Sequence, residues 1–183
     1  MAFYEQRLTF ANTTEQPQTI WMSVTNEYEN MTPGTDDSSA LNYTIATEQV
    51  NAIRGLNSDQ TLTIITSGGT FLLSSGVSTE PLTSTNVVVR RQTTFGGADL
   101  RPEQIGSFLY YVQANDRTVR ELAFNFEFDR FIARDMTLTS GHMTEDGIDY
   151  IAYQQSPENY LWALRSDGKL AVLARDLDQN IQG

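Results

Sequence analysis

Residues Ile148–Leu173 read IDYIAYQQSPENYLWALRSDGKLAVL, in which two polar turns separate three apolar runs. Proline favours the first turn, Ser156–Asn159, because its ring fixes φ near a value that turns use. Asp167 followed by Gly168 favours the second turn, because glycine tolerates the positive φ of a tight hairpin. The stretch therefore predicts a meander of three antiparallel strands.

The central run of this meander carries bulky or apolar side chains on both of its faces. Tyr160, Trp162 and Leu164 alternate with Leu161 and Ala163. A strand that is apolar on both faces needs cover on both faces. We therefore expect more sheet to pack against this meander.

The rest of the chain has the same character, with short β-type runs between polar segments rich in Gly, Pro, Asn and Asp. Only Phe131–Met143 has helical spacing, and it is too short to define a helix. We expect strands at Phe3–Ala11, Gln18–Val24, Leu41–Ala46, Val50–Leu56, Thr61–Thr66, Thr70–Ser74, Asn86–Thr93, Ser107–Gln113 and Thr118–Phe128.

The chain is therefore expected to be all-β and built from antiparallel β-meanders. Hairpins recur around Pro17, Gly68-Gly69, Asn115 and Pro157. Short meanders that need cover on both faces are typical of β-propeller blades. A β-sandwich is the alternative architecture, and it would normally leave one polar face on each strand. Residues 1–183 are expected to form a single all-β domain or part of a larger β-propeller protein.

Composition restricts the classes of function. The chain has 183 residues, no cysteine, a formal net charge of −11 and a pI near 4.4. The absence of cysteine excludes disulfides, thiolate metal sites and thiol nucleophiles. The acidic balance argues against a protein that grips nucleic-acid phosphates. No apolar run reaches membrane length, so we expect no membrane partner.

Residues that could carry catalysis do not form a convincing set. His142 is the only histidine, and Ser140 and Asp146 are its neighbours in sequence. Catalytic triads are assembled from separated segments, so a surface histidine is the better interpretation. Carboxylates are also clustered, and in so acidic a chain solvated loop charges explain them: Asp36-Asp37, Glu145-Asp146 with Asp149, and Asp176 with Asp178. We expect no catalytic residues and no enzyme activity.

Metal, cofactor and ligand signals are equally weak. Asp176, Asp178 and Asn180 begin a calcium-loop pattern, but the glycine and distant glutamate of such a loop are missing. Gly68-Gly69 and Gly96-Gly97 lack the Lys-Ser/Thr of a phosphate loop. We expect no metal and no cofactor. The remaining candidates are aromatic residues that could line a sugar groove or fill the core (Trp21, Trp162, Tyr110, Tyr111, Tyr150, Tyr153), and basic residues that could protect strand edges (Arg90, Arg91, Arg117, Arg120).

Five segments carry a resemblance to a known family, and the most distinctive is Ala152–Leu170, AYQQSPENYLWALRSDGKL. The others are Ala11–Ser23 (ANTTEQPQTIWMS), Thr66–Ser74 (TSGGTFLLS), Val89–Gly96 (VRRQTTFG) and Val119–Glu127 (VRELAFNFE). These segments resemble a family of bacteriophage tail proteins from short-tailed phages and prophage tail clusters, the tail tube or nozzle proteins similar to tail tubular protein B.

The resemblance implies a structural, non-catalytic virion component: a tail tube, nozzle or hub subunit that contains a β-propeller and joins a ring around the DNA exit channel. It implies assembly in the host cytoplasm, a homo-oligomeric ring, neighbours on the adaptor or portal side and among the fibres, and DNA that passes without specific binding. Family members are longer, so the chain resembles an internal segment of one. The alternative function is a carbohydrate-binding or carbohydrate-cleaving β module of a phage tail.

Two long polar loops, Thr25–Ala40 and Gly76–Thr85, are the segments that we expect to form subunit interfaces.

Overall fold

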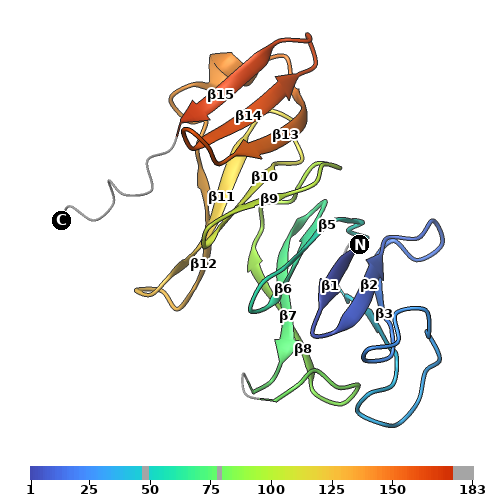
Figure 1. The fold of residues 1–183 in the computed structure, drawn as a ribbon. Coiled ribbons are helices and arrows are strands. Elements are labelled where there is room, and N and C mark those ends of the chain that lie inside the picture. Colours follow the sequence, from blue (N-terminus) through green and yellow to red (C-terminus); the bar gives the residue numbers. More distant parts are fainter. Residues whose placement is uncertain (47–49, 78–79, 175–183) are drawn as a thin grey trace. The chain divides into compact units, whose positions relative to one another are not determined.

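The computed structural model describes residues 1–46, 50–77 and 80–174, and within them the fold is all-β. Four antiparallel sheets follow one another along the chain, and each is a meander of consecutive strands (Figure 1). The expectation of an all-β chain of antiparallel meanders is confirmed.

The strands occur in chain order within each sheet. The first sheet holds β1 (Ala2–Tyr4), β2 (Arg7–Ala11), β3 (Thr19–Met22) and β4 (Leu41–Thr44). The second holds β5 (Ile53–Ser58), β6 (Leu62–Thr66), β7 (Gly69–Ser75) and β8 (Val87–Thr93). The third holds β9 (Glu103–Ile105), β10 (Phe108–Val112), β11 (Val119–Asn125) and β12 (Arg130–Asp135), and the last holds β13 (Ile148–Gln154), β14 (Tyr160–Arg165) and β15 (Leu170–Ala174).

One predicted strand is in fact a hairpin. The range Phe3–Ala11 contains most of β1 and all of β2, which pair directly across a two-residue turn. Both turn residues, Glu5 and Gln6, have positive φ (45° and 59°), as in the tight turns whose twist suits a hairpin. The sequence prediction was wrong because this turn lacks the Asn-Gly or Asp-Gly pair that normally marks it.

Two further strands were missed. β9 lies in a segment between predicted strands, and its three residues are too few to show alternation; pairing with β10 holds it in the sheet. The range Phe131–Met143, with its short helical spacing, contains most of β12 and part of a 3₁₀ turn, η1 (Gly141–Thr144). In both places pairing with a neighbouring strand determines the structure, and the local sequence pattern does not reveal this pairing.

The chain divides into two compact units, Met1–Asp99 and Leu100–Gly183. The first unit contains the first two sheets, which share one hydrophobic core. Its buried members come from both sheets and, at Ile45 and Leu82, from the connecting segments: Tyr4, Ile20, Met22, Leu41, Ile45, Ile53, Leu62, Ile64, Phe71, Leu73 and Leu82. β6 is buried along its whole length, as a central strand between covered faces should be.

The second unit contains the third and last sheets. Tyr110, Tyr111 and Leu122 of the third sheet are almost fully buried, as is Ile151 of the last. The predicted meander is present as β13–β15, with turns at the predicted places and a cis peptide bond between Ser156 and Pro157.

The cover expected on both faces of this meander is found on one face. Leu161 and Ala163 of β14 are buried, but Tyr150, Leu164 and Leu170 on the other face are 53%, 38% and 62% exposed. The described part of the chain supplies no second layer over that face.

Candidate functional site

The possible triad residues lie together in sequence but do not form a triad. Ser140 precedes η1, and His142 is exposed within it. The carboxylate of Asp146 accepts a hydrogen bond from the guanidinium of Arg165, a residue of β14. Asp146 therefore ties the η1 segment to the last sheet rather than orienting the imidazole of His142.

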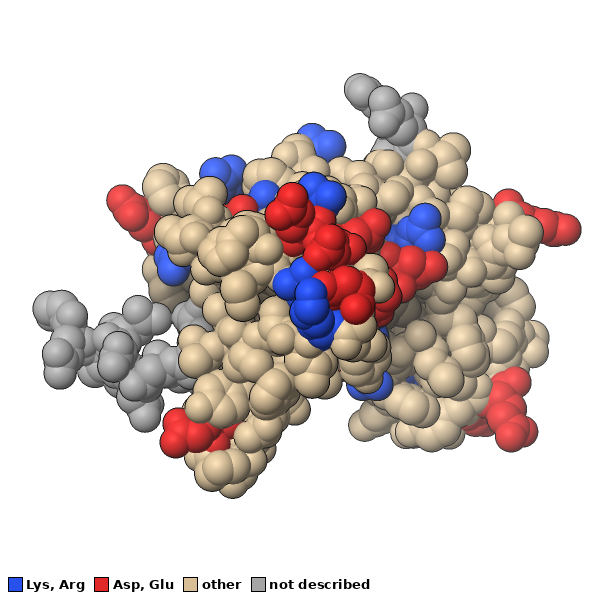
Figure 2. Space-filling view, turned by 90° about the horizontal axis from the view of Figure 1, so that it is seen from above, with Lys and Arg blue, Asp and Glu red and all other residues tan. Residues whose placement is uncertain are grey.

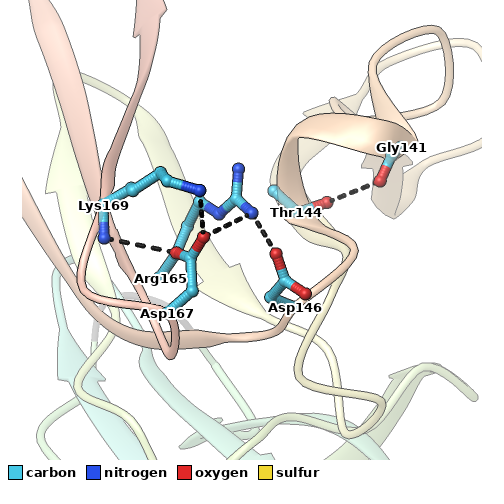
Figure 3. Close-up of polar contacts among 6 residues, drawn as sticks. All are labelled: Gly141, Thr144, Asp146, Arg165, Asp167 and Lys169. Atoms are coloured by element: carbon cyan, nitrogen blue, oxygen red, sulfur yellow. Dashed lines mark hydrogen bonds and ion pairs between the residues drawn. The ribbon is translucent and has the colours of Figure 1, made fainter.

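Arg165 is the centre of the densest charged cluster that the structure describes (Figure 3). Its Nη2 also binds Asp167 Oδ2 at 3.0 Å, and Lys169 Nζ lies 2.9 Å from the same oxygen. The backbone N–H of Lys169 donates to Asp167 Oδ1 at 3.2 Å. These bonds, led by that of the Lys169 side chain, lower the pKa of Asp167 below its ordinary value. The cluster fixes the β14–β15 turn.

Other acidic candidates hold local structure too. Asp149 accepts a hydrogen bond of 2.6 Å from the hydroxyl of Ser166. Asp36 and Asp37 are exposed, and their backbone carbonyls, not their carboxylates, make the recorded contacts. No group of three metal-ligating side chains converges among residues 1–46, 50–77 and 80–174. The Asp176, Asp178 and Asn180 pattern lies outside the described residues.

The two glycine pairs meet in space, which the sequence did not indicate. Gly68 lies in the two-residue β6–β7 turn and Gly69 begins β7, and the chain after β8 returns to this turn at Gly96. A Cβ atom at Gly96 would lie 2.0 Å from the backbone oxygen of Ser67. The Gly97 N–H donates to the Thr66 carbonyl at 2.8 Å. The glycines permit backbone-to-backbone packing and do not surround a cavity for phosphate.

The aromatic candidates separate into buried and accessible groups. Tyr110 and Tyr111 are core residues, and the Tyr110 hydroxyl donates to the buried Glu121 carboxylate at 2.5 Å. Trp162 is half-buried on β14, and its indole N–H donates to Gln154. Tyr150 is 53% exposed on the same face of the last sheet. Tyr150 and Trp162 thus share one face of the last sheet, where a sugar ring could contact their aromatic surface.

A buried arginine was not among the residues singled out from the sequence. Arg7 lies on β2, is 2% exposed, and donates to four carbonyl groups of the segment between β3 and β4. Its bonds to Ser23, Asp37 and Ser39 measure 2.8, 2.7 and 2.6 Å, and a longer one of 3.3 Å reaches Ser38. Burial lowers the pKa of this guanidinium.

Arg7 thereby anchors the predicted loop Thr25–Ala40 to the first sheet. The only local signal was a charged residue in an otherwise apolar strand, and its partners lie 16 to 32 residues away. Such partners cannot be read from a strand pattern.

Comparisons with known proteins do not assign this chain to a family. Neither a scan against protein-family models nor a search of curated proteins finds a match to this chain. In the described part of the chain, no helix has the length and apolar character that a bilayer crossing requires.

Proposed function

We propose that this chain is a structural, non-catalytic component of a phage tail: a tail tube, nozzle or hub subunit that forms part of a ring around the DNA exit channel. The observation that carries the proposal is the series of four consecutive antiparallel meanders. Serial meanders are the arrangement of propeller blades, the fold that the resemblance to tail tube and nozzle proteins implies. In this proposal the meanders are blades, and neighbouring subunits complete the ring.

The use of the polar side chains supports a structural role. Arg7 anchors a loop, and Arg165, Asp167 and Lys169 fix a turn. The buried Tyr110 binds a buried glutamate between neighbouring strands. Each of these groups stabilises the fold, and none is directed at a space that could hold a substrate.

The acidic surface fits a channel that DNA traverses without binding. The chain has 23 acidic and 12 basic residues. Asp and Glu side chains lie at several separate places on the face shown in Figure 2. Carboxylates repel phosphates within a screening length of about 8–10 Å. A lumen lined in part by such groups would let DNA pass and would not retain it.

The second candidate function is glycan binding by a tail module. It is favoured by one observation, the accessible Tyr150 and half-buried Trp162 on the open face of β13–β15. Aromatic rings on an open sheet face can stack on sugar rings. The nearby carboxylates of Asp146 and Asp149 already bind Arg165 and Ser166, which disfavours a cleaving enzyme.

A gene-disruption experiment separates the two functions. In the phage that encodes the chain, loss of a tube or nozzle subunit should leave filled or leaking heads without complete tails. Supplying the chain in trans should restore complete tails. Complete tails that fail only to adsorb to the host would contradict the structural proposal and support the glycan-binding function.

The loop Thr25–Ala40 should be tested by point substitutions in this experiment. Deleting it would also remove three of the four carbonyl groups that bind Arg7 and would destabilise the first sheet. An assembly defect from such a deletion would then not report on an interface.

A further inference from the structure

The hairpin that joins β11 and β12 extends beyond the rest of its sheet. β10 pairs with β11 only over Val119–Leu122, whereas β11 and β12 continue to pair as far as Asn125 and Arg130. Residues 123–132 are therefore a two-stranded ribbon without a third strand, and the hairpin projects away from β9 and β10 (Figure 1). We call residues 123–132 the aromatic tip.

Four phenylalanines give the aromatic tip its character. Phe126 is 91% exposed, Phe128 58% and Phe124 40%. Phe124 packs edge-to-face against Phe126 and against its cross-strand partner Phe131, with centroids 5.0 and 5.4 Å apart. Exposed rings on a projecting element are costly in water and are characteristic of residues that anchor interfaces.

The aromatic tip is held in shape before any partner arrives. The Asn125 side chain accepts a hydrogen bond from the Phe128 N–H at 3.1 Å, and Arg130 lies over the Phe128 ring at 5.9 Å. Asp129 adopts the left-handed conformation that closes the turn. A preorganised tip loses little conformational entropy on binding.

Charge indicates the chemistry of the partner. Glu127 and Asp129 are exposed between and beside the exposed rings. A bilayer surface is disfavoured, because these two carboxylates would have to approach lipid headgroups together with the rings. A protein surface with apolar groups next to cationic ones matches the aromatic tip better.

This chain carries such a surface in its other unit. Arg90 and Arg91 are the only adjacent basic residues in the sequence, and both are exposed on the edge strand β8. Among the described residues neither makes an ion pair or a side-chain hydrogen bond. Val88 and Val89, which directly precede the arginines on β8, are half-buried. We call Val88, Val89, Arg90 and Arg91 the arginine edge.

We propose that the aromatic tip of one copy binds the arginine edge of a second copy. The rings meet Val88, Val89 and the guanidinium planes, and Glu127 and Asp129 pair with Arg90 and Arg91. Protection of an edge strand is enough to explain the two exposed arginines. It does not explain why the aromatic tip carries exposed phenylalanine rings that match them. Because the aromatic tip and the arginine edge are different surfaces, the contact is head-to-tail. Repeated contacts of this kind form a closed ring when the rotation between successive copies adds up to a full turn. The inference rests on the proposed function and gives its ring a specific interface.

Sedimentation equilibrium of the purified chain at micromolar concentrations tests the interface. The wild-type chain should self-associate, and Phe126→Ala should weaken the association about 30-fold, as truncation of an interface anchor does. Leu138→Ala is the matched control, since Leu138 is 78% exposed in the same unit but lies outside the aromatic tip. R90E/R91E should weaken association at least about tenfold, while the control R101E/R117E should not.

Mixing two defective variants tests the head-to-tail arrangement. F126A/E127K has a defective tip and an intact edge, and R90E/R91E has the reverse. Each alone should remain monomeric, and an equimolar mixture should form a one-to-one complex through the single intact pair. A contact between two tips would give no complex in this mixture and would overturn the proposal. Circular dichroism checks that each variant is folded.

Three further outcomes would decide between the proposed interface and its alternatives. A wild-type chain that stays monomeric overturns the interface, whether or not the chain is a tail component. Vesicles of phosphatidylcholine and phosphatidylglycerol that bind the wild type but not F126A, without self-association, would assign the aromatic tip to a lipid surface. A self-associating chain absent from phage tails would overturn the proposed function and leave the interface standing.

Discussion

Removing the Arg7 side chain should destabilise the first unit strongly. The guanidinium is 2% exposed and makes three short hydrogen bonds, of 2.6, 2.7 and 2.8 Å, to backbone carbonyls. A hydrogen bond to a charged group contributes about 1.5–3 kcal/mol, so three give a gross value of about 4.5–9 kcal/mol. The desolvation that lowers the Arg7 pKa offsets part of this sum. We expect Arg7→Ala to lower the free energy of unfolding by about 3–5 kcal/mol.

Urea unfolding followed by tryptophan fluorescence measures this loss. Arg7→Lys keeps the charge but not the planar fork of donors, so it should fall between wild type and Arg7→Ala. Arg54→Ala is the control, because Arg54 makes only an exposed ion pair with Asp99, of 3.1 Å, whose loss should cost less than about 1 kcal/mol.

Limited proteolysis supplies a local measurement of the same substitution. The loop Thr25–Ala40 should be cleaved sooner in Arg7→Ala than in wild type, because its carbonyls lose their anchor. A loss of stability below about 1 kcal/mol with unchanged cleavage would refute the role assigned to Arg7.

Three further predictions concern single positions. Gly96→Ala should lower the free energy of unfolding by at least about 2 kcal/mol, because its Cβ would lie 2.0 Å from a backbone oxygen; Gly141→Ala, which has open space, is the control in urea unfolding. Tyr110→Phe should cost about 1.5–3 kcal/mol in the same assay, because it removes a 2.5 Å hydrogen bond to the buried carboxylate of Glu121. Because the pKa of Asp167 is lowered in the folded chain, its carboxylate contributes fully to the free energy of unfolding at neutral pH. This contribution is lost as the pH falls through the lowered pKa. Stability measured from pH 5 to pH 2 should therefore fall less steeply in Asp167→Asn, and equal slopes would contradict the assignment.

The last meander was predictable because its sequence carries strong turn signals. A proline turn and an Asp-Gly turn separate apolar runs of strand length, and β13, β14 and β15 follow them closely. The β1–β2 turn was not predictable in this way, because Glu5 and Gln6 adopt positive φ without the residues that normally favour it. β9 is held in place by its neighbour, which local sequence does not report.

The candidate residues show the same division between local and distant information. Sequence arguments separated His142 from a triad on spacing, and the structure gives Asp146 a different partner, Arg165. The meeting of Gly96 with the β6–β7 turn depends on chain reversals that the pattern does not encode. The anchoring role of Arg7 depends on carbonyl groups that only the folded loop brings together.

Immunogold electron microscopy tests the central proposal most directly. On the proposed function a phage encodes this chain. Antibody raised against the chain is applied to purified particles of that phage, with particles assembled without the chain as the control. The proposed function predicts gold at the tail stem. Gold on peripheral fibres or spikes, or on no part of the particle, would contradict it.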